Sequence, residues 1–118
     1  MAVPADIGAL RAAELLSPRQ QQLRELLLMT EEIGSLAEQG EWNEALSRQR
    51  DRRLAMEAFF AQACSAEESG LVAQVIQHIL TIDDNVSTAL ANKRNTLSHK
   101  QLEHRRKAQN GGRYLSNC

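Results

Sequence analysis

Aromatic residues, prolines and glycines are all scarce in this sequence of 118 residues. Aromatics make up only 3% of the chain, which also has two prolines and six glycines. Aromatic and β-branched residues favour strands, and a sandwich or barrel needs many turns built from glycine and proline. The composition therefore argues against an all-β fold and favours helices, whose core must be built from Leu, Ile, Val, Ala and Met.

The chain also has too few cysteines for a disulfide-rich protein and too short apolar runs for a membrane-spanning one. Cys64 and Cys118 cannot make a disulfide framework, and they lack the CxxC spacing of many metal and redox sites. Nowhere do about 18 apolar residues follow one another, as a membrane span requires. Residues 1–16 lack the basic cluster and apolar stretch of a secretory signal. We therefore expect a cytoplasmic protein without membrane insertion.

Residues that commonly carry catalysis or bind metals form no recognisable motif. His99 and His104 are five positions apart, which turns them about 140° away from each other on a helix. Asp83 and Asp84 are neighbours, so their carboxylates diverge and cannot share a proton, and we expect both to be solvated. The chain also lacks a glycine-rich phosphate loop and a nucleophile elbow. We therefore expect no enzyme activity, no metal and no cofactor.

The sequence does contain residues that mark the start and end of helices, and the clearest set begins at residue 17. Ser17 can cap a helix, Pro18 suits its first position and Gln20 completes a capping box. Gly40 stands where a left-handed C-terminal cap is expected. These signals predict a helix at 18–39, preceded at 1–16 by an arm or a short helix. Its inner face should carry apolar residues at helical spacing, namely Leu23, Leu26, Leu27, Ile33, Leu36 and Ala37.

A second helix is predicted at 42–64, with a polar interruption in its middle. Within SRQRDRRLA at 47–55, one of Gln49, Arg52 and Arg53 must occupy a position that is apolar in an ordinary core helix. We favour arginine stems lying over the edge of the core, with Asp51 and nearby glutamates as partners. The alternative is a polar patch that recognises a partner. The inner side of this helix is expected to carry Trp42, Ala45, Leu46, Met56, Phe59, Phe60 and Ala63.

A third and longer helix is predicted at 66–107. Ser65 and Glu68 form a second capping box. Unbroken, this helix is about 60 Å long, whereas each of the two before it is about 33 Å. Either it breaks near 92–95 into a fourth C-terminal helix, or part of its stripe is left for another chain. Its apolar stripe contains Leu71, Val72, Val75, Ile76, Ile79, Ile82, Val86, Leu90 and Leu97.

Together these segments predict an all-α fold, a single domain over residues 1–118. Its three main helices, at 18–39, 42–64 and 66–107, should form an antiparallel bundle, because short connections join neighbours. Gly111 and Gly112 end the helical pattern. We expect a frayed tail at 108–118.

Charge is distributed unevenly along the chain, although the net charge is only −1. Residues 1–92 carry 7 basic and 14 acidic groups, whereas residues 93–118 carry 7 basic groups and 1 acidic group. Lys93, Lys100 and Lys107 recur every seven residues and form a basic stripe that could follow phosphates. The acidic body and the lack of a recognition motif argue against nucleic-acid binding. We expect the basic end to meet the acidic body or an acidic partner.

Three stretches, taken in order, resemble the FliT-type flagellar export chaperones. They are GEWNEAL at 40–46, RQRDRRLAMEAFF at 48–60 and QHILTIDDNVSTALANKRNTL at 77–97. RRKAQNGGRYL at 105–115 is similar to the basic C-terminal segment of that family. The resemblance implies a helical chaperone that holds the filament-cap protein in the cytosol and delivers it to the type III export ATPase complex. It also implies binding to a flagellar transcriptional activator.

The apolar stripe of the long helix is the predicted contact surface. A stripe longer than its own bundle needs is suited to an amphipathic partner segment. For Val75 and Ile79 a core position is the favoured alternative, whereas Leu90 and Leu97 lie beyond the shorter helices. Two other functions remain open, a homodimeric helical adaptor and a nucleic-acid-binding regulator that uses the basic stripe. The predicted partner-binding residues are Val75, Ile79, Ile82, Val86, Leu90, Leu97 and Tyr114.

Overall fold

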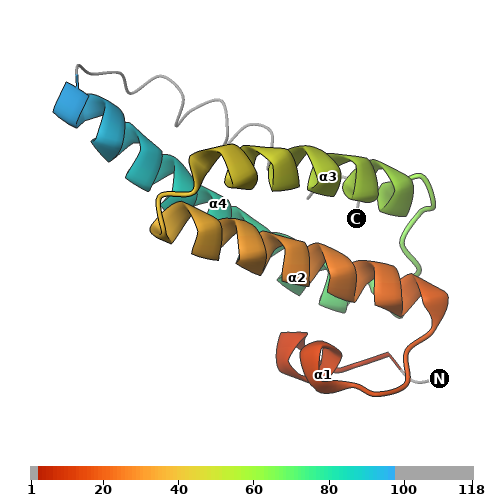
Figure 1. The fold of residues 1–118 in the computed structure, drawn as a ribbon. Helices are drawn as coiled ribbons and strands as arrows, with labels where there is room; N and C mark the ends of the chain where they lie inside the picture. Colours follow the sequence, from red (N-terminus) through yellow and green to blue (C-terminus); the bar gives the residue numbers. More distant parts are fainter. Residues whose placement is uncertain (1–2, 98–118) are drawn as a thin grey trace.

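The computed structural model describes residues 3–97, and within this range all the regular secondary structure is helical. Helices α2 (Pro18–Glu38), α3 (Trp42–Phe60) and α4 (Ser69–Leu97) form an up-down-up bundle, and the short α1 (Ile7–Ala12) packs beside α2 and α4 (Figure 1). The predicted all-α antiparallel bundle of three main helices is therefore confirmed. Helix α4 runs unbroken through residues 92–95 to Leu97, so the break predicted there is wrong. A fourth helix beyond Leu97 and the predicted tail at 108–118 lie outside the described residues.

Both ends of α2 are formed by the predicted caps. The Ser17 hydroxyl accepts a hydrogen bond from the Gln20 N–H (3.2 Å), and the Gln20 side chain accepts one from the Ser17 N–H (3.1 Å). Gly40 has a φ of 76°, the left-handed conformation that glycine adopts without a Cβ clash. Its N–H donates to the carbonyl of Ala37, which would otherwise lack a helical partner. The helix therefore ends at Glu38, one residue before the predicted end.

The connection between α3 and α4 is longer than the sequence predicted. Helix α3 ends at Phe60 instead of residue 64, and α4 begins at Ser69 instead of residue 66. The predicted capping box is present, because the Ser65 N–H donates to the Glu68 carboxylate (3.0 Å) and the Glu68 N–H donates to the Ser65 hydroxyl (3.2 Å). Residues 66–68 form a turn before the helix, so the box closes this turn.

Arg19 of α2 gives a physical reason for the early end of α3. Its guanidinium donates hydrogen bonds to the carbonyls of Phe59 and Gln62, at 2.5 Å and 3.0 Å. The same group pairs with Glu68 at 3.2 Å and lies 3.6 Å from the centre of the Phe59 ring. Carbonyls at a helix end need partners from outside the helix. Arg19 supplies them, and it ties both sides of the connection to α2.

Most of the core lies at the end of the bundle that α1 covers. Twelve buried residues form one cluster there, which we call the closed-end core: Leu10, Leu16, Leu23, Leu26, Leu27, Met56, Phe59, Leu71, Val72, Val75, Ile76 and Ile79. A second cluster, the open-end cluster, has only three buried residues, Ile33, Ala37 and Val86, with Trp42 and Ile82 packed against them. The two ends therefore differ greatly in buried apolar surface.

Helix α4 is longer than its neighbours within the described residues. It contains 29 residues, against 21 in α2 and 19 in α3. At 1.5 Å per residue these helices measure about 44, 32 and 29 Å. The last turns of α4 extend past the α2–α3 turn, at the open end of the bundle (Figure 1). The length mismatch expected from the sequence is therefore present.

Two residues predicted on the inner side of α3 are exposed. Leu46 retains 49% of its accessible surface, and Ala63 lies in the connection after the helix. Ala45 is buried, and a neighbouring residue on a helix points about 100° away from it. Leu46 therefore faces outward, and its predicted place in the core was wrong.

The polar position in the middle of α3 is filled by Arg52, which is only 8% exposed. Its guanidinium makes a two-pronged pair with Asp83 of α4 at 2.9 Å and donates to the Thr30 hydroxyl of α2 at 3.1 Å. The expectation of an arginine stem at the core edge was therefore wrong for Arg52, and so was the expectation that Asp83 is solvated. Asp51 pairs with Arg48 instead. In the described part of the chain, the backbones of α3 and α4 do not come close to each other. The Arg52–Asp83 ion pair therefore joins these two helices through their side chains.

Candidate functional site

A groove of about 460 Å³ lies between α2 and α4 at the open end of the bundle. Gly34 and Ala37 line it from α2, and Ile82, Val86 and Ala89 line it from α4. A Cβ at position 34 would lie 3.0 Å from the Cγ2 atom of Ile82. Glycine therefore lets the two helices approach at this point and leaves space beside it. The floor that results is apolar, with small side chains on one wall.

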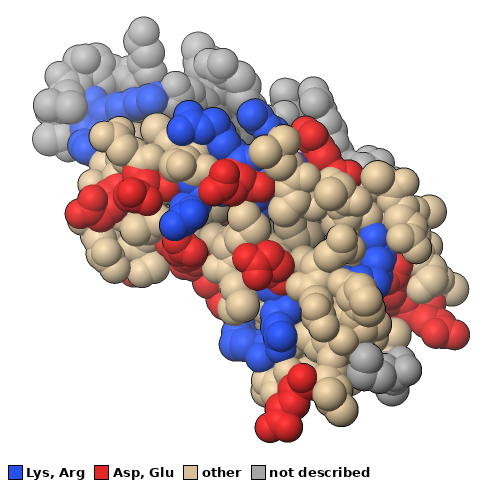
Figure 2. Space-filling view, turned by 45° about the vertical axis from the view of Figure 1, so that its right-hand side comes forward, with Lys and Arg blue, Asp and Glu red and all other residues tan. Residues whose placement is uncertain are grey.

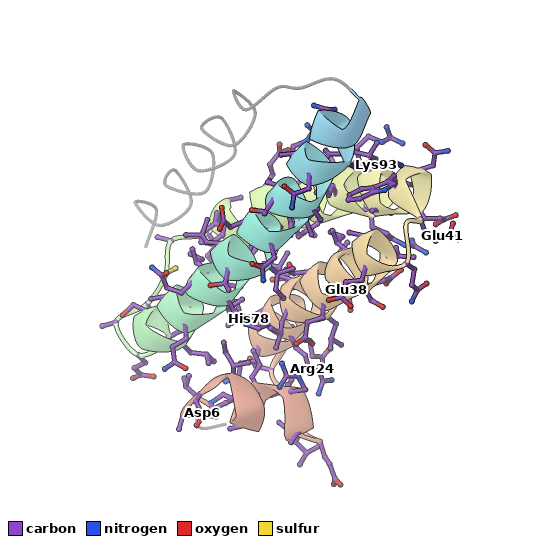
Figure 3. All side chains as sticks on the ribbon, turned by 90° about the vertical axis from the view of Figure 1, so that its left-hand side faces the viewer. Asp6, Arg24, Glu38, Glu41, His78 and Lys93 are labelled. Atoms are coloured by element: carbon purple, nitrogen blue, oxygen red, sulfur yellow. The ribbon has the colours of Figure 1, made fainter. Side chains whose placement is uncertain are left out.

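The rim of the groove is polar and carries carboxylates. Glu31 pairs with Arg11 of α1 at 2.5 Å, and His78 of α4 lies 3.4 Å from the same carboxylate. Glu38 lines the groove further along α2, and Figure 3 looks onto this side, with Glu38 and His78 labelled on facing helices. An apolar floor with a polar rim is typical of sites that hold one face of an amphipathic helix.

The predicted contact residues of α4 lie in different environments. Val75 and Ile79 are buried in the closed-end core. Val86 is buried, but it also lines the groove. Ile82 and Leu90 are half-buried, and Ile82 lines the groove as well. The structure therefore brings Ile82 and Val86 together at one site, with Leu90 one turn further along α4.

Several predicted residues lie outside the part of the chain that the structure describes. They include Tyr114, Lys100 and Lys107, and the side chain of Leu97 at the end of α4. Of the predicted basic stripe only Lys93 is described. Its ammonium lies 5.5 Å from the centre of the Trp42 ring, a cation–π contact between α4 and the start of α3 (Figure 3). Lys93 therefore contacts the bundle itself.

The α2 wall of the groove was not predicted as a site from the sequence. Ala37 was assigned only to an inner face, and Gly34 and Glu38 were not singled out. A signal was present, since glycine inside a helix costs about 1 kcal/mol relative to alanine and needs a packing reason. Gly34 interrupts a strong helical pattern, and its packing reason is the close approach of Ile82.

One face of the molecule is electrostatically mixed. Lys and Arg side chains lie beside Asp and Glu side chains over the face shown in Figure 2. Attraction to Glu32 and a hydrogen bond with it raise the pKa of the Arg48 guanidinium above its ordinary value. Among residues 3–97, no helix has the length and hydropathy to cross a bilayer. No three His, Cys, Asp or Glu side chains of the same range are grouped so that they could hold a metal ion.

Comparison with known proteins gives a family for the chain. The family model described as flagellar protein FliT matches residues 20–116. This range includes both walls of the groove and almost all of α2, α3 and α4. No curated protein and no solved structure gives a match.

Proposed function

Because this chain belongs to the FliT family of flagellar proteins, we propose that it is a flagellar type III export chaperone. In this role it binds the filament-cap protein in the cytosol and delivers it to the export ATPase complex. It also binds a flagellar transcriptional activator. The family match over residues 20–116 is the observation that carries the proposal, and the groove supports it.

The groove supplies a surface for an amphipathic helix of the client. Ile82, Val86 and Leu90 are spaced four residues apart, so they form one row along α4. A client helix with apolar residues at matching helical spacing would cover the exposed parts of Ile82 and Leu90. Burial of apolar surface stabilises such a complex by about 25 cal/mol per Å² before the costs of association. We extend this contact surface to Leu97 and Tyr114.

Isothermal titration of the full chain with purified filament-cap protein tests the proposed function. We expect saturable binding, with affinity at least about tenfold higher than for a flagellar filament subunit. The filament subunit is the control, because it is a flagellar protein other than the proposed client. Equal affinity for the two proteins, or no binding to the cap protein, would contradict a dedicated cap-protein chaperone.

A further inference from the structure

The outward side of α3 presents an exposed apolar and cationic surface. Leu46 and Leu54 retain 49% and 63% of their accessible surface, and Arg50 and Arg53 between them are also exposed. Residues three and four apart on a helix are neighbours, so these four side chains form one continuous patch. We call it the α3 patch. The inner row of the same helix contains Ala45, Arg52, Met56 and Phe59, which face the core.

Arg50 and Arg53 differ from the other arginines that precede residue 93. Neither makes an ion pair or hydrogen bond with another described residue, whereas the other five all have partners: Arg11 with Glu31, Arg19 with Glu68, Arg24 with the Ala13 carbonyl, Arg48 with Glu32 and Arg52 with Asp83. Carboxylates are not in short supply, because residues 1–92 carry 14 acidic groups against 7 basic ones. Arg50 and Arg53 therefore leave two guanidinium groups without a partner among the described residues, although Asp51 and Glu57 are exposed beside them on α3.

We propose that the α3 patch binds an acidic amphipathic helix of another protein, at a site separate from the groove between α2 and α4. Two adjacent guanidinium groups suit Asp or Glu side chains, because their forked donors match a carboxylate. The two leucines provide apolar anchors on either side of the charges. A partner helix with carboxylates one turn apart, flanked by apolar residues, complements both features. This inference does not depend on the proposed chaperone function.

A second copy of the chain fits the α3 patch poorly. In an antiparallel twofold pair of α3 helices, the register that places Leu46 against Leu54 also places Arg50 against Arg50, and like charges in contact are unfavourable. The register that places Arg50 against Glu57 leaves Leu46 beyond Phe60, where the partner helix ends. Neither register both buries the leucines and pairs the arginines, so an acidic partner of another sequence is the better occupant.

Fluorescence anisotropy with two synthetic helical peptides tests the proposed site. The probe peptide has leucines on one face and flanking glutamates, and the control peptide has lysines in place of the glutamates. We expect the full chain to bind the glutamate peptide at least about tenfold more tightly than the lysine peptide, with the difference shrinking at high salt. Equal affinity for the two peptides would overturn the proposal.

A matched pair of variants locates the binding. Replacing Arg50→Gln and Arg53→Gln together should weaken glutamate-peptide binding about tenfold or more. The control carries Gln22→Glu and Thr88→Glu at exposed positions elsewhere, which changes the net charge by the same amount, and it should bind normally. Equal loss in both variants would mean that only net charge matters, and the proposal would fail.

Two further measurements separate the α3 patch from other sites. Ile82→Glu in the groove should leave affinity for the glutamate peptide unchanged, and loss of peptide binding in this variant would place the peptide in the groove. Light scattering on the chain alone tests whether the α3 patch forms a dimer. We expect no dimer whose dissociation is caused by Leu54→Ala. Such a dimer would mean that a second copy covers the patch. All replaced side chains are exposed or half-buried, and circular dichroism confirms the fold of each variant.

Discussion

The two ends of this bundle are packed very differently, although the same three helices form both. At the closed end, eleven buried residues from the four helices and Leu16 from the connection between α1 and α2 make one core, with Phe59 and Leu10 almost fully enclosed. At the open end, the buried apolar cluster has only three residues, and the groove between α2 and α4 remains beside them.

This difference assigns stability of the fold mainly to the closed end and binding of a partner to the open end. Buried apolar area dominates the stability of a small domain, so the closed end supplies most of it. The open end has little core to lose, and its apolar side chains remain available to another protein. Binding surfaces are commonly found in the less stable parts of a fold for this reason. The predictions below test this division between the two ends.

The largest expected loss of stability comes from the closed end. Phe59→Ala removes a side chain that contacts the core, the Arg19 guanidinium and the edge of Phe60. We expect the free energy of unfolding to fall by about 3–5 kcal/mol, the usual cost of emptying an aromatic core site. Urea denaturation followed by circular dichroism measures it. A loss under about 1 kcal/mol would show that the closed end does not hold the fold together.

The next largest effect concerns the link between α3 and α4. Arg52→Ala leaves Asp83 partly buried without its partner, so we expect a loss of about 2–4 kcal/mol in the free energy of unfolding. The double variant Arg52→Met with Asp83→Leu removes both charges and keeps most of the volume. It should regain at least half of that loss in the same urea experiment. If the double variant is less stable than Arg52→Ala, the ion pair itself stabilises the bundle beyond filling space.

Two chemically identical deletions compare the ends directly. Val72→Ala removes two methyl groups from the closed-end core, and Val86→Ala removes two from the open-end cluster beside the groove. We expect losses of about 2–3 kcal/mol and about 1 kcal/mol respectively, because the cost rises with the cavity left behind and the open end already borders solvent. Differential scanning calorimetry of the two variants gives the ratio. Equal losses would remove the distinction between the ends.

The smallest expected change in stability accompanies the clearest change in binding. Ile82→Glu places a carboxylate in the groove, where Ile82 is only half-buried, so folding should be little affected. Affinity for the filament-cap protein should fall at least about tenfold, or 1.4 kcal/mol, through desolvation of the new charge. Thr88→Glu, exposed on another side of α4, is the control for added charge. Equal loss in both variants would place the client elsewhere.

Local signals in the sequence predicted the elements well. Ser17, Pro18 and Gln20 marked the start of α2, and Gly40 marked its end, because caps depend on residues a few positions apart. The apolar rows of α2 and α4 predicted most of the core for the same reason. The all-helical bundle and the excess length of α4 followed from these rows and from helix geometry.

Features that depend on distant residues were not predicted. The sequence after Phe60 carries no clear stop signal, and Arg19, 40 positions before Phe59, binds the carbonyls of Phe59 and of Gln62 just beyond the end of α3. Asp83 could not be identified as the partner of Arg52, since they lie 31 positions apart. The groove depends on Gly34 meeting Ile82 across two helices. The sequence pattern of α2 or of α4 alone cannot predict how close Gly34 lies to Ile82.

Hydrogen exchange of the chain with and without the filament-cap protein tests the central claim most directly. The account predicts slower exchange of backbone amides at 34–38 and 82–91 in the complex, with no change at 71–76, where α4 lies in the closed-end core. Protection confined to the closed end, or no protection along the groove in a saturated complex, would contradict it.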